Sequence, residues 1–232
     1  MKHTFLTLLL ITFTGFCYAQ DTTANAGPET VTRTNNPSTD IQEKFTVLKA
    51  DKKVNQGLFQ AFFHEKILVA SGRYDHGVKV GTWRYNSIKG IIDQAYDYTN
   101  NKVIFARKPD TSFARFEFDT KISDTDSLTY PIKLGGNFYG YWFLIDARID
   151  QFIKDMHNEG MSKEYICTHI LNVGADGILT RWQLLVISKN FKKLYEIQLD
   201  KLSDDDKLFI PATQNGKPVG SNVYVKTKTK FF

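Results

Sequence analysis

A pattern of glycine and aromatic residues recurs at a spacing of 24 residues between about Phe45 and Arg107. A shift by this spacing places Gly57-Leu58-Phe59 on Gly81-Thr82-Trp83. Periods in this range are typical of stacked supersecondary units. Turn sequences such as Asp75-His76-Gly77 separate the aromatic-rich runs, and they tolerate the positive φ of tight hairpins. The repeat therefore predicts an antiparallel meander with strands near 57–63, 66–74, 80–86, 90–98 and 102–107.

The repeat region, 44–108, also carries a family resemblance. Gly72-Arg73-Tyr74-Asp75-His76-Gly77, followed by Gly81-Thr82-Trp83-Arg84-Tyr85, resembles the MORN-type repeat variant of exported and antitoxin-like bacterial proteins. The resemblance covers roughly two repeats and implies a structural or binding sheet rather than a reaction. We expect Gly72 and Gly81 to occupy positions that require positive φ or close backbone approach.

The N-terminus has the layout of a secretory signal peptide over residues 1–19. Lys2 and His3 precede an apolar run from Phe5 to Phe16, and small residues follow up to Ala19. The run is too short to span a bilayer as a helix. We therefore expect an exported protein, periplasmic or secreted, that begins at Gln20 and is not an integral membrane protein.

A lipoprotein signal is the alternative reading of the same segment. It would make Cys17 the acylated residue, and the protein would then be lipid-anchored. Bulky Phe16 next to the cleaved bond argues against this reading.

Two segments lack a hydrophobic period. Residues 20–43 are rich in polar and turn-forming residues, which predicts a flexible linker. Residues 109–130 form a connecting segment, in which Phe113, Phe116 and Phe118 indicate one further strand. Asp124 and Asp126 share the spacing that opens a calcium loop, but the Gly and Glu that complete such a loop are missing, so we interpret them as part of a polar turn.

The last hundred residues show a mixed pattern. Helical spacing predicts helices over 143–156 and 190–202. Strands are expected at 166–172 and 178–187, joined by the turn Gly174-Ala175-Asp176-Gly177, and a strictly alternating strand is expected at 222–231. The chain as a whole is thus predicted to be α+β, a β-meander followed by a small domain with two helices on an antiparallel sheet.

Residues 131–232 resemble the C-terminal domain of TonB-like proteins. The matching motifs, in chain order, are Gly135-Gly136, Asp176-Gly177, Phe209-Ile210-Pro211 and Gln214-Asn215-Gly216-Lys217-Pro218-Val219. Phe209 stands where the family has Trp, and the family's Tyr-Pro after the first helix is missing. The resemblance implies that a partner segment binds by adding a strand to the domain's sheet.

The terminal strand is the partner-binding element that this resemblance suggests. Val223, Val225, Thr227, Thr229 and Phe231 would face the core. The opposite, solvated face would carry the candidate partner-binding residues Tyr224, Lys226, Lys228 and Lys230. The alternative is that this strand is paired on both sides within the chain, or is covered by the repeat domain.

No motif indicates catalysis, a cofactor or a metal. Nucleophile-elbow, phosphate-loop, His-Glu-x-x-His and Cys-x-x-Cys motifs are missing from the sequence. His157, Glu159, Cys167 and His169 form the one constellation that zinc would suit, but their spacing matches no known ligand set. The formal net charge of +5 is spread out, so nucleic acid is not an expected partner.

Three function classes remain open. The first is a non-catalytic exported binding or adaptor protein whose partner is another envelope protein. The second is a structural envelope protein whose repeat sheet binds surface polymer or lipid. The third is a hydrolase with an unrecognised site. The sequence does not indicate the oligomeric state.

Overall fold

The computed structural model describes residues 27–109, 111, 114–141, 144–145 and 164–230. This part of the chain is mostly β-structure, and its helices are only single short turns. The predicted α+β class, with two helices on an antiparallel sheet, is therefore wrong.

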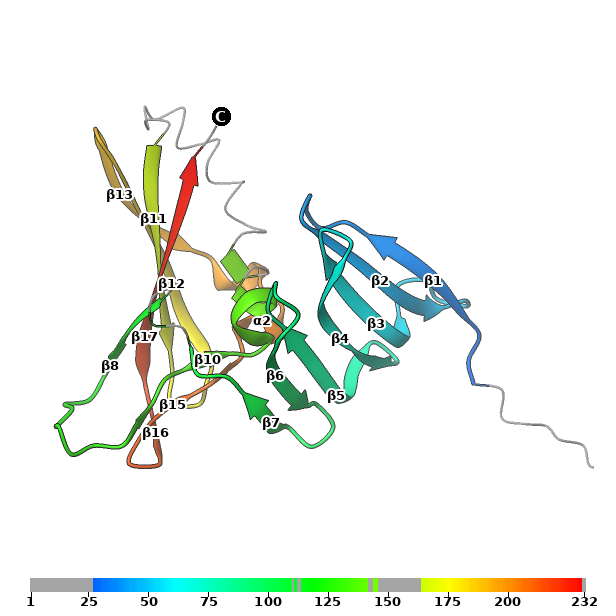
Figure 1. Cartoon of the computed structure of the whole chain (residues 1–232), viewed down its shortest axis with the longest axis horizontal. Helices are drawn as coiled ribbons and strands as arrows, with labels where there is room; N and C mark the ends of the chain where they lie inside the picture. Colours follow the sequence, from blue (N-terminus) through cyan, green and yellow to red (C-terminus); the bar gives the residue numbers. More distant parts are fainter. Residues whose placement is uncertain (1–26, 110, 112–113, 142–143, 146–163, 231–232) are drawn as a thin grey trace, which may run out of the picture.

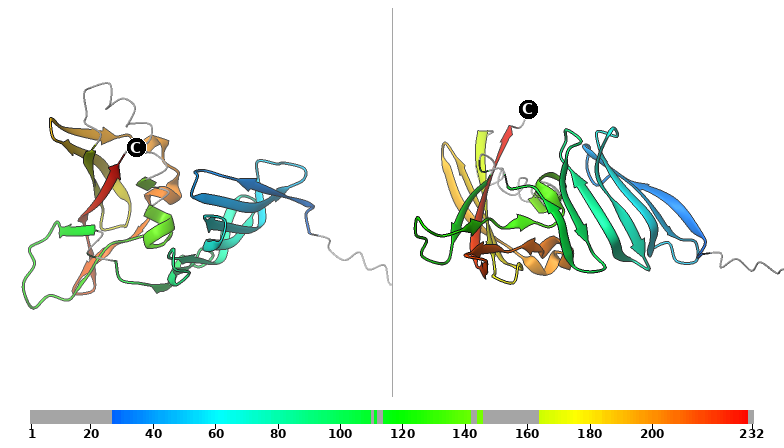
Figure 2. Two further views of the ribbon diagram at one scale, coloured as in Figure 1. Left: turned by 45° about the horizontal axis from the view of Figure 1, so that its top comes forward. Right: turned by 60° about the horizontal axis from the view of Figure 1, so that its bottom comes forward.

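The first sheet is a seven-stranded antiparallel meander in which spatial order follows chain order (Figures 1 and 2). This confirms the meander predicted from the repeat. Its strands are β1 (Thr30–Asn35), β2 (Ile41–Leu48), β3 (Asn55–Phe63), β4 (Ile67–Asp75), β5 (Val78–Asn86), β6 (Ile92–Asp97) and β7 (Lys102–Ala106).

One period of the repeat corresponds to one hairpin of the meander. A step of 24 residues carries β3 onto β5 and β4 onto β6. Gly57 and Gly81 both have positive φ, at 90° and 62°. The repeated aromatic residues form one continuous column across the sheet, with ring centroids 5.8 Å apart for Phe59 and Tyr74, 5.1 Å for Tyr74 and Trp83, and 5.8 Å for Trp83 and Tyr98.

The predicted linker includes part of this sheet. Within 20–43, β1 is a strand and β2 begins at Ile41. Every side chain of β1 is exposed, and the strand is held by its antiparallel pairing with β2. The polar composition excluded a core segment, but it did not exclude an edge strand that buries no side chain.

The second sheet has five strands, β8 (Ala114–Phe118), β11 (Glu164–Val173), β12 (Leu179–Ser188), β13 (Phe191–Ile197) and β17 (Ser221–Lys230). Their order in the sheet is β13-β12-β11-β17-β8. β11 and β12 are joined by the predicted hairpin turn, in which the N–H of Gly174 donates to the carbonyl of Ile178 at 2.9 Å. The apolar face of this sheet forms the larger hydrophobic core, which includes Trp182 and Leu184.

The helix predicted over 190–202 is wrong. Phe191–Ile197 forms strand β13, and only Leu199–Lys201 makes a short 3-10 turn, η3. Ser188 pairs with Phe191, so Lys189 and Asn190 are the two residues of a tight hairpin turn. Pairing of the whole of β13 with Trp182–Ser188 of β12 outweighs the helical spacing of the apolar residues. The other predicted helix, 143–156, lies almost wholly outside the described residues.

Small elements join the two sheets. β10 (Ile132–Lys133) pairs with β14 (Phe209–Ile210), while β15 (Ala212–Gln214) pairs with both β9 (Leu128–Thr129) and β16 (Lys217–Val219). The π-helical turn η1 (Gly136–Gly140) and the short helix α2 (Asp204–Lys207) lie between the sheets (Figure 1).

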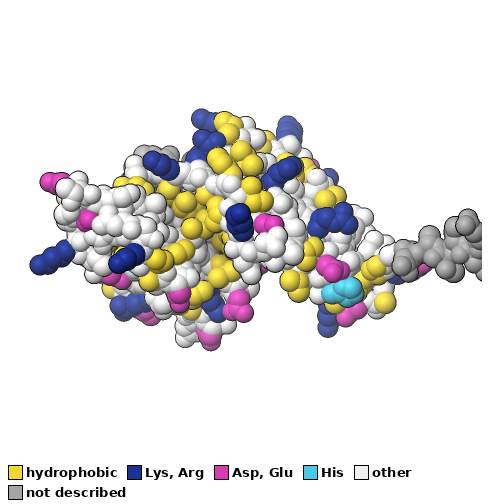
Figure 3. Space-filling view, turned by 90° about the horizontal axis from the view of Figure 1, so that it is seen from below, with side chains coloured by type: hydrophobic (Ala, Val, Ile, Leu, Met, Phe, Trp, Pro, Cys, Tyr) yellow, Lys and Arg dark blue, Asp and Glu magenta, His cyan; other side chains and the backbone are white. Residues whose placement is uncertain are grey.

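Side chains on the surface are of mixed type. The face seen in Figure 3 has hydrophobic side chains gathered near its middle, with basic and acidic side chains interspersed around them. Among the described residues, no helix has the length and apolar character needed to cross a membrane.

Candidate functional site

A cleft of about 420 Å³ lies at the junction of the two sheets. The meander forms one wall, while β10, η1 and α2 form the other. The volume falls within the range of about 300–1,000 Å³ that is typical of small-ligand sites. The residues that line it are Glu43, Phe45, Asn55, Phe59, Tyr74, Lys79, Tyr85, Tyr98, Lys133, Leu134, Gly135, Tyr139, Gly140, Ser203, Asp205 and Asp206.

Six aromatic side chains line the cleft. Phe45, Tyr74 and Tyr98 are only half-buried, so parts of their rings face the open space. Tyr85 is buried behind them, and its hydroxyl lies 2.9 Å from that of Tyr98. Tyr139 of η1 stacks on Tyr85 with ring centroids 6.2 Å apart, which continues the aromatic column of the repeat into the second wall.

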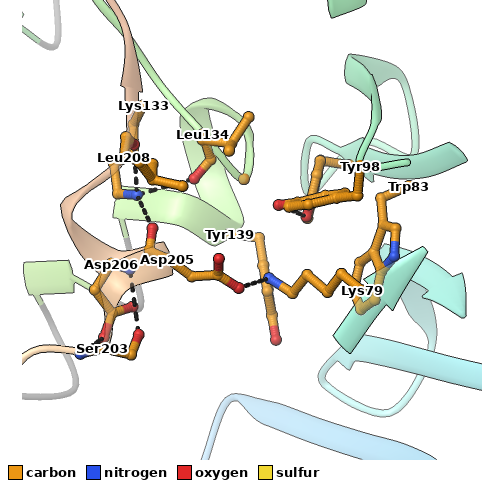
Figure 4. A network of polar contacts seen from close by, with 12 residues as sticks. Lys79, Trp83, Tyr98, Lys133, Leu134, Tyr139, Ser203, Asp205, Asp206 and Leu208 are labelled. Carbon is orange, nitrogen blue, oxygen red and sulfur yellow. Dashed lines mark hydrogen bonds and ion pairs between the residues drawn. The ribbon is translucent and has the colours of Figure 1, made fainter. Parts of the chain in front are cut away.

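Lys79 crosses the cleft from one wall to the other. Its Nζ forms an ion pair with Oδ2 of Asp205 at 2.8 Å (Figure 4). On the way it lies 4.8 Å from the ring centroid of Trp83 and 5.1 Å from that of Tyr98. Burial alone would lower the pKa of Lys79, but Tyr98, Tyr74 and Asp205 outweigh it and raise this pKa. Lys79 therefore remains charged and ties β5 to α2.

Asp205 is placed by a capping box at the start of α2. The Ser203 hydroxyl accepts a hydrogen bond from the N–H of Asp206 at 3.2 Å, and the Asp206 carboxylate accepts one from the N–H of Ser203 at 3.3 Å. This reciprocal pair satisfies two backbone donors and fixes the first turn. The turn holds the Asp205 side chain toward Lys79.

Lys133 is fully buried behind the cleft. Its Nζ donates to the carbonyl oxygens of Leu134, Asp205 and Leu208 at 3.0, 3.2 and 3.0 Å (Figure 4). Burial lowers the pKa of Lys133 to about 7, against the opposing effect of Asp206 and Asp205. All three donors are satisfied, so this lysine braces the wall and has no donor left for a ligand.

Glu43 is the buried acid of the opposite wall. Its side chain accepts hydrogen bonds from the hydroxyl of Tyr139 at 2.9 Å and from Nδ2 of Asn35 at 3.2 Å. Burial raises the pKa of Glu43 despite both hydrogen bonds. Like the lysines, Glu43 is thus paired within the protein.

The charged groups of the cleft all have partners within the protein: Lys79 pairs with Asp205, Lys133 donates to backbone carbonyls, and Glu43 accepts from the neutral side chains of Tyr139 and Asn35. A charged ligand that binds Lys79 or Asp205 would have to break their ion pair, and that leaves a buried charge uncompensated. The surfaces left for a ligand are the partly exposed rings of Phe45, Tyr74 and Tyr98, together with tyrosine hydroxyl oxygens. That combination suits an uncharged polar molecule with a flat apolar face.

The predicted partner-binding residues lie elsewhere, on β17. Tyr224 donates its hydroxyl to Oε2 of Glu117 at 2.6 Å, and the Arg115 guanidinium lies 3.9 Å from its ring centroid. Lys226 is exposed, whereas Lys228 and Lys230 are described only in their backbone. Tyr224 and Lys226 are not among the residues that line the cleft.

β17 is an interior strand over half its length. It pairs with β11 along Ser221–Lys230 and with β8 along Ser221–Val225. The alternative of pairing on both sides thus holds for the first half of the strand. Among the described residues, Lys226–Lys230 pairs with β11 alone.

Cys167 and His169 share the buried face of β11, as the sequence suggested. Nε1 of Trp182 donates to Nδ1 of His169 at 3.1 Å, and burial lowers the pKa of His169 to about 4. His157 and Glu159 lie outside the described residues. Within the described ranges, no three His, Cys, Asp or Glu side chains gather as metal ligands would.

Sequence reasoning missed the charged residues of the cleft. Glu43, Lys79, Lys133 and Asp205 come from four distant segments, and no local spacing connects them. Two signals were present. Tyr74 and Tyr98 are repeated positions, and Ser203-Asp204-Asp205-Asp206 has capping-box spacing.

The chain was compared with protein-family models, curated proteins and solved structures, and none of them matches it. The resemblances to MORN-type repeats and to TonB-like domains stay predictions.

Proposed function

We propose that this chain is an exported, non-catalytic binding protein that holds a neutral saccharide unit of an envelope or surface polymer in the junction cleft. The observation that carries the proposal is the half-exposed aromatic wall of Phe45, Tyr74 and Tyr98 in a cleft whose charges are already paired. The proposal that the chain is exported rests on residues 1–19, which have the layout of a signal peptide.

The chemistry of a saccharide matches that wall. One face of a pyranose ring is a patch of C–H groups that stacks on aromatic rings, and its hydroxyls exchange hydrogen bonds with tyrosine and carboxylate oxygens. Tyr74 and Tyr98 present hydroxyl oxygens at the cleft. A neutral sugar leaves the Lys79–Asp205 ion pair intact.

Isothermal titration with neutral oligosaccharides tests the proposal. We would titrate cellohexaose, maltohexaose and hexa-N-acetylchitohexaose, with polygalacturonate as the anionic comparison. The expected result is saturable binding of at least one neutral oligosaccharide and none of polygalacturonate. Binding of polygalacturonate alone, or of no saccharide, would contradict the proposal.

Variants locate the binding. Tyr74→Ala removes a ring from the cleft wall and should weaken binding by about two- to tenfold, in line with the loss of one aromatic contact. The matched control is Phe62→Ala. Phe62 is also half-buried next to a lysine, with Lys44 Nζ 5.3 Å from its ring centroid, but it does not line the cleft. Equal effects of the two variants would place the ligand elsewhere.

A further inference from the structure

β13 forms an outer margin of the five-stranded sheet. Within the described ranges its strand pairing is with β12 alone, from Phe191 opposite Ser188 to Ile197 opposite Trp182. Figures 1 and 2 show the strand at the far end of the molecule from the meander. Every second residue of such an edge presents an N–H and a C=O that can accept another strand.

The side chains of β13 alternate between the two faces of the sheet. Lys192, Leu194 and Glu196 point to the solvent face, where Leu194 is 51% exposed. Phe191, Tyr195 and Ile197 lie on the core face. A large apolar side chain is therefore centred on the edge strand, with one basic and one acidic residue two positions to either side.

Glu196 is held in a fixed orientation. Nε and Nη2 of Arg181 donate to its two carboxylate oxygens at 2.8 and 3.0 Å, and Nε2 of Gln183 donates to Oε2 at 3.1 Å. These contacts lower the pKa of Glu196, with the Arg181 hydrogen bond as the largest cause. The carboxylate is charged, oriented and still half-exposed, so it can accept a further cation.

We propose that β13 pairs antiparallel with β13 of a second copy, about a twofold axis that passes through Leu194. In this register Lys192 faces Glu196 of the second copy, twice by symmetry, and Leu194 faces its own equivalent. On the core face, Phe191 lies opposite Ile197 of the second copy. The two five-stranded sheets then form one continuous sheet, in which the β13 edge of each copy is paired.

The charges select this register over its neighbours. A twofold axis perpendicular to the sheet must pair residues of the same face, so alternative axes pass through other single residues of the strand. An axis through Lys192, Lys193 or Glu196 sets that residue opposite its own copy, a like-charge pair. An axis through Tyr195 sets Leu194 opposite Glu196. Only the axis through Leu194 pairs opposite charges.

Charge reversal tests the register by sedimentation equilibrium of the full chain. The wild-type protein should show a concentration-dependent shift from monomer to dimer. K192E and E196K each create two like-charge pairs, and each should weaken the dimer about tenfold or more. An equimolar mixture of the two variants pairs opposite charges again and should restore dimers. Circular dichroism checks that each variant is folded.

Cysteine crosslinking tests the axis itself. In a Cys17→Ser background, Leu194→Cys places two thiols directly opposite each other, where the Cα atoms of antiparallel partners lie about 4.5–5.5 Å apart and a disulfide fits. Mild oxidation should give a covalent dimer. The control is Leu58→Cys, which is 49% exposed on β3 but is flanked by β2 and β4.

Three results would overturn the proposal. The first is a monomer at all protein concentrations up to about 1 mM, the weak limit of specific association. The second is a dimer that neither charge reversal nor mixing changes. The third is crosslinking of Leu58→Cys as fast as that of Leu194→Cys. These outcomes are independent of saccharide binding, because β13 contributes no residue to the cleft.

Discussion

The indole ring of Trp83 lies directly over Gly72, in the space that a side chain at position 72 would fill. Gly72 pairs with Phe59 across β3 and β4, and the Phe59 ring lies 5.3 Å from that of Trp83. The glycine thus lets the repeated aromatic residues of β3 and β5 meet across the strand between them. The aromatic column, and the cleft wall built on it, depend on this missing side chain.

Gly72→Ala should therefore destabilise the protein by about 2 kcal/mol, because its methyl group overlaps the Trp83 ring and overpacking costs about 1–3 kcal/mol. Urea unfolding followed by circular dichroism measures the change. A cost below about 0.5 kcal/mol would show that the column repacks easily, in conflict with the close approach of Trp83.

Position 81 requires glycine for a different reason, which is its backbone conformation. Its φ is 62°, and the space beside its Cα is open. Gly81→Val should cost more than about 1 kcal/mol through backbone strain, whereas Gly81→Asn should cost less, because Asn tolerates left-handed φ. Thermal melting of both variants provides the comparison. Equal melting temperatures for the two would contradict a strain mechanism.

Gln94 holds the two walls of the cleft together. This buried side chain donates from Nε2 to the carbonyl of Lys133 at 3.2 Å and accepts from the N–H of Gly135 at 2.8 Å. Gln94→Leu leaves both backbone groups unpaired and should cost about 2–6 kcal/mol, at roughly 1–3 kcal/mol for each group.

The control for Gln94 is Gln60→Leu, at a half-buried position within the meander. Differential scanning calorimetry measures the melting temperatures of the two variants. We expect Gln94→Leu to lower the melting temperature by several degrees, while Gln60→Leu leaves it nearly unchanged. A result in which both variants melt like the wild type would show that the junction does not depend on Gln94.

The lowered pKa of Lys133 makes the free energy of unfolding depend on pH. Burial lowers its pKa from the ordinary value of 10.5 to about 7, so above pH 7 the unfolded chain binds a proton that the folded chain does not. The free energy of unfolding should therefore rise with pH, at about 1.4 kcal/mol per pH unit from this group between about 7 and 10.

Lys133→Met removes that contribution. The difference in unfolding free energy between wild type and variant should grow in favour of the wild type from pH 7 to pH 9.5, as measured by urea titration at each pH. Curves that run parallel across this range would mean that Lys133 keeps its ordinary pKa in the folded protein.

The repeat was the most informative part of the sequence. Its period predicted the strands of the meander, since each hairpin must repeat the same glycine and aromatic positions to build one column. The α+β prediction failed at 190–202, where Phe191, Leu194 and Ile197 have helical spacing but Lys189-Asn190 forms a tight turn back along β12. Spacing within one segment does not reveal the partner strand that decides its conformation.

The cleft was less predictable than the sheets. Its aromatic wall follows from the repeat, because Tyr74 and Tyr98 are equivalent positions. Its charged groups come together only through the tertiary packing of β5, β10 and α2 at the junction. Spacing along the sequence does not predict that packing. The pairing of Lys79 with Asp205 across 126 positions of sequence is such a case.

Saturation-transfer difference NMR tests the stacking of a saccharide in the cleft most directly. Irradiation of the protein's aromatic protons, in the presence of the neutral oligosaccharide that binds, should transfer saturation to the ring C–H protons of the sugar. The transfer should be lost in Tyr74→Ala and retained in Phe62→Ala. Transfer that persists undiminished in Tyr74→Ala would contradict a saccharide site at the junction of the two sheets.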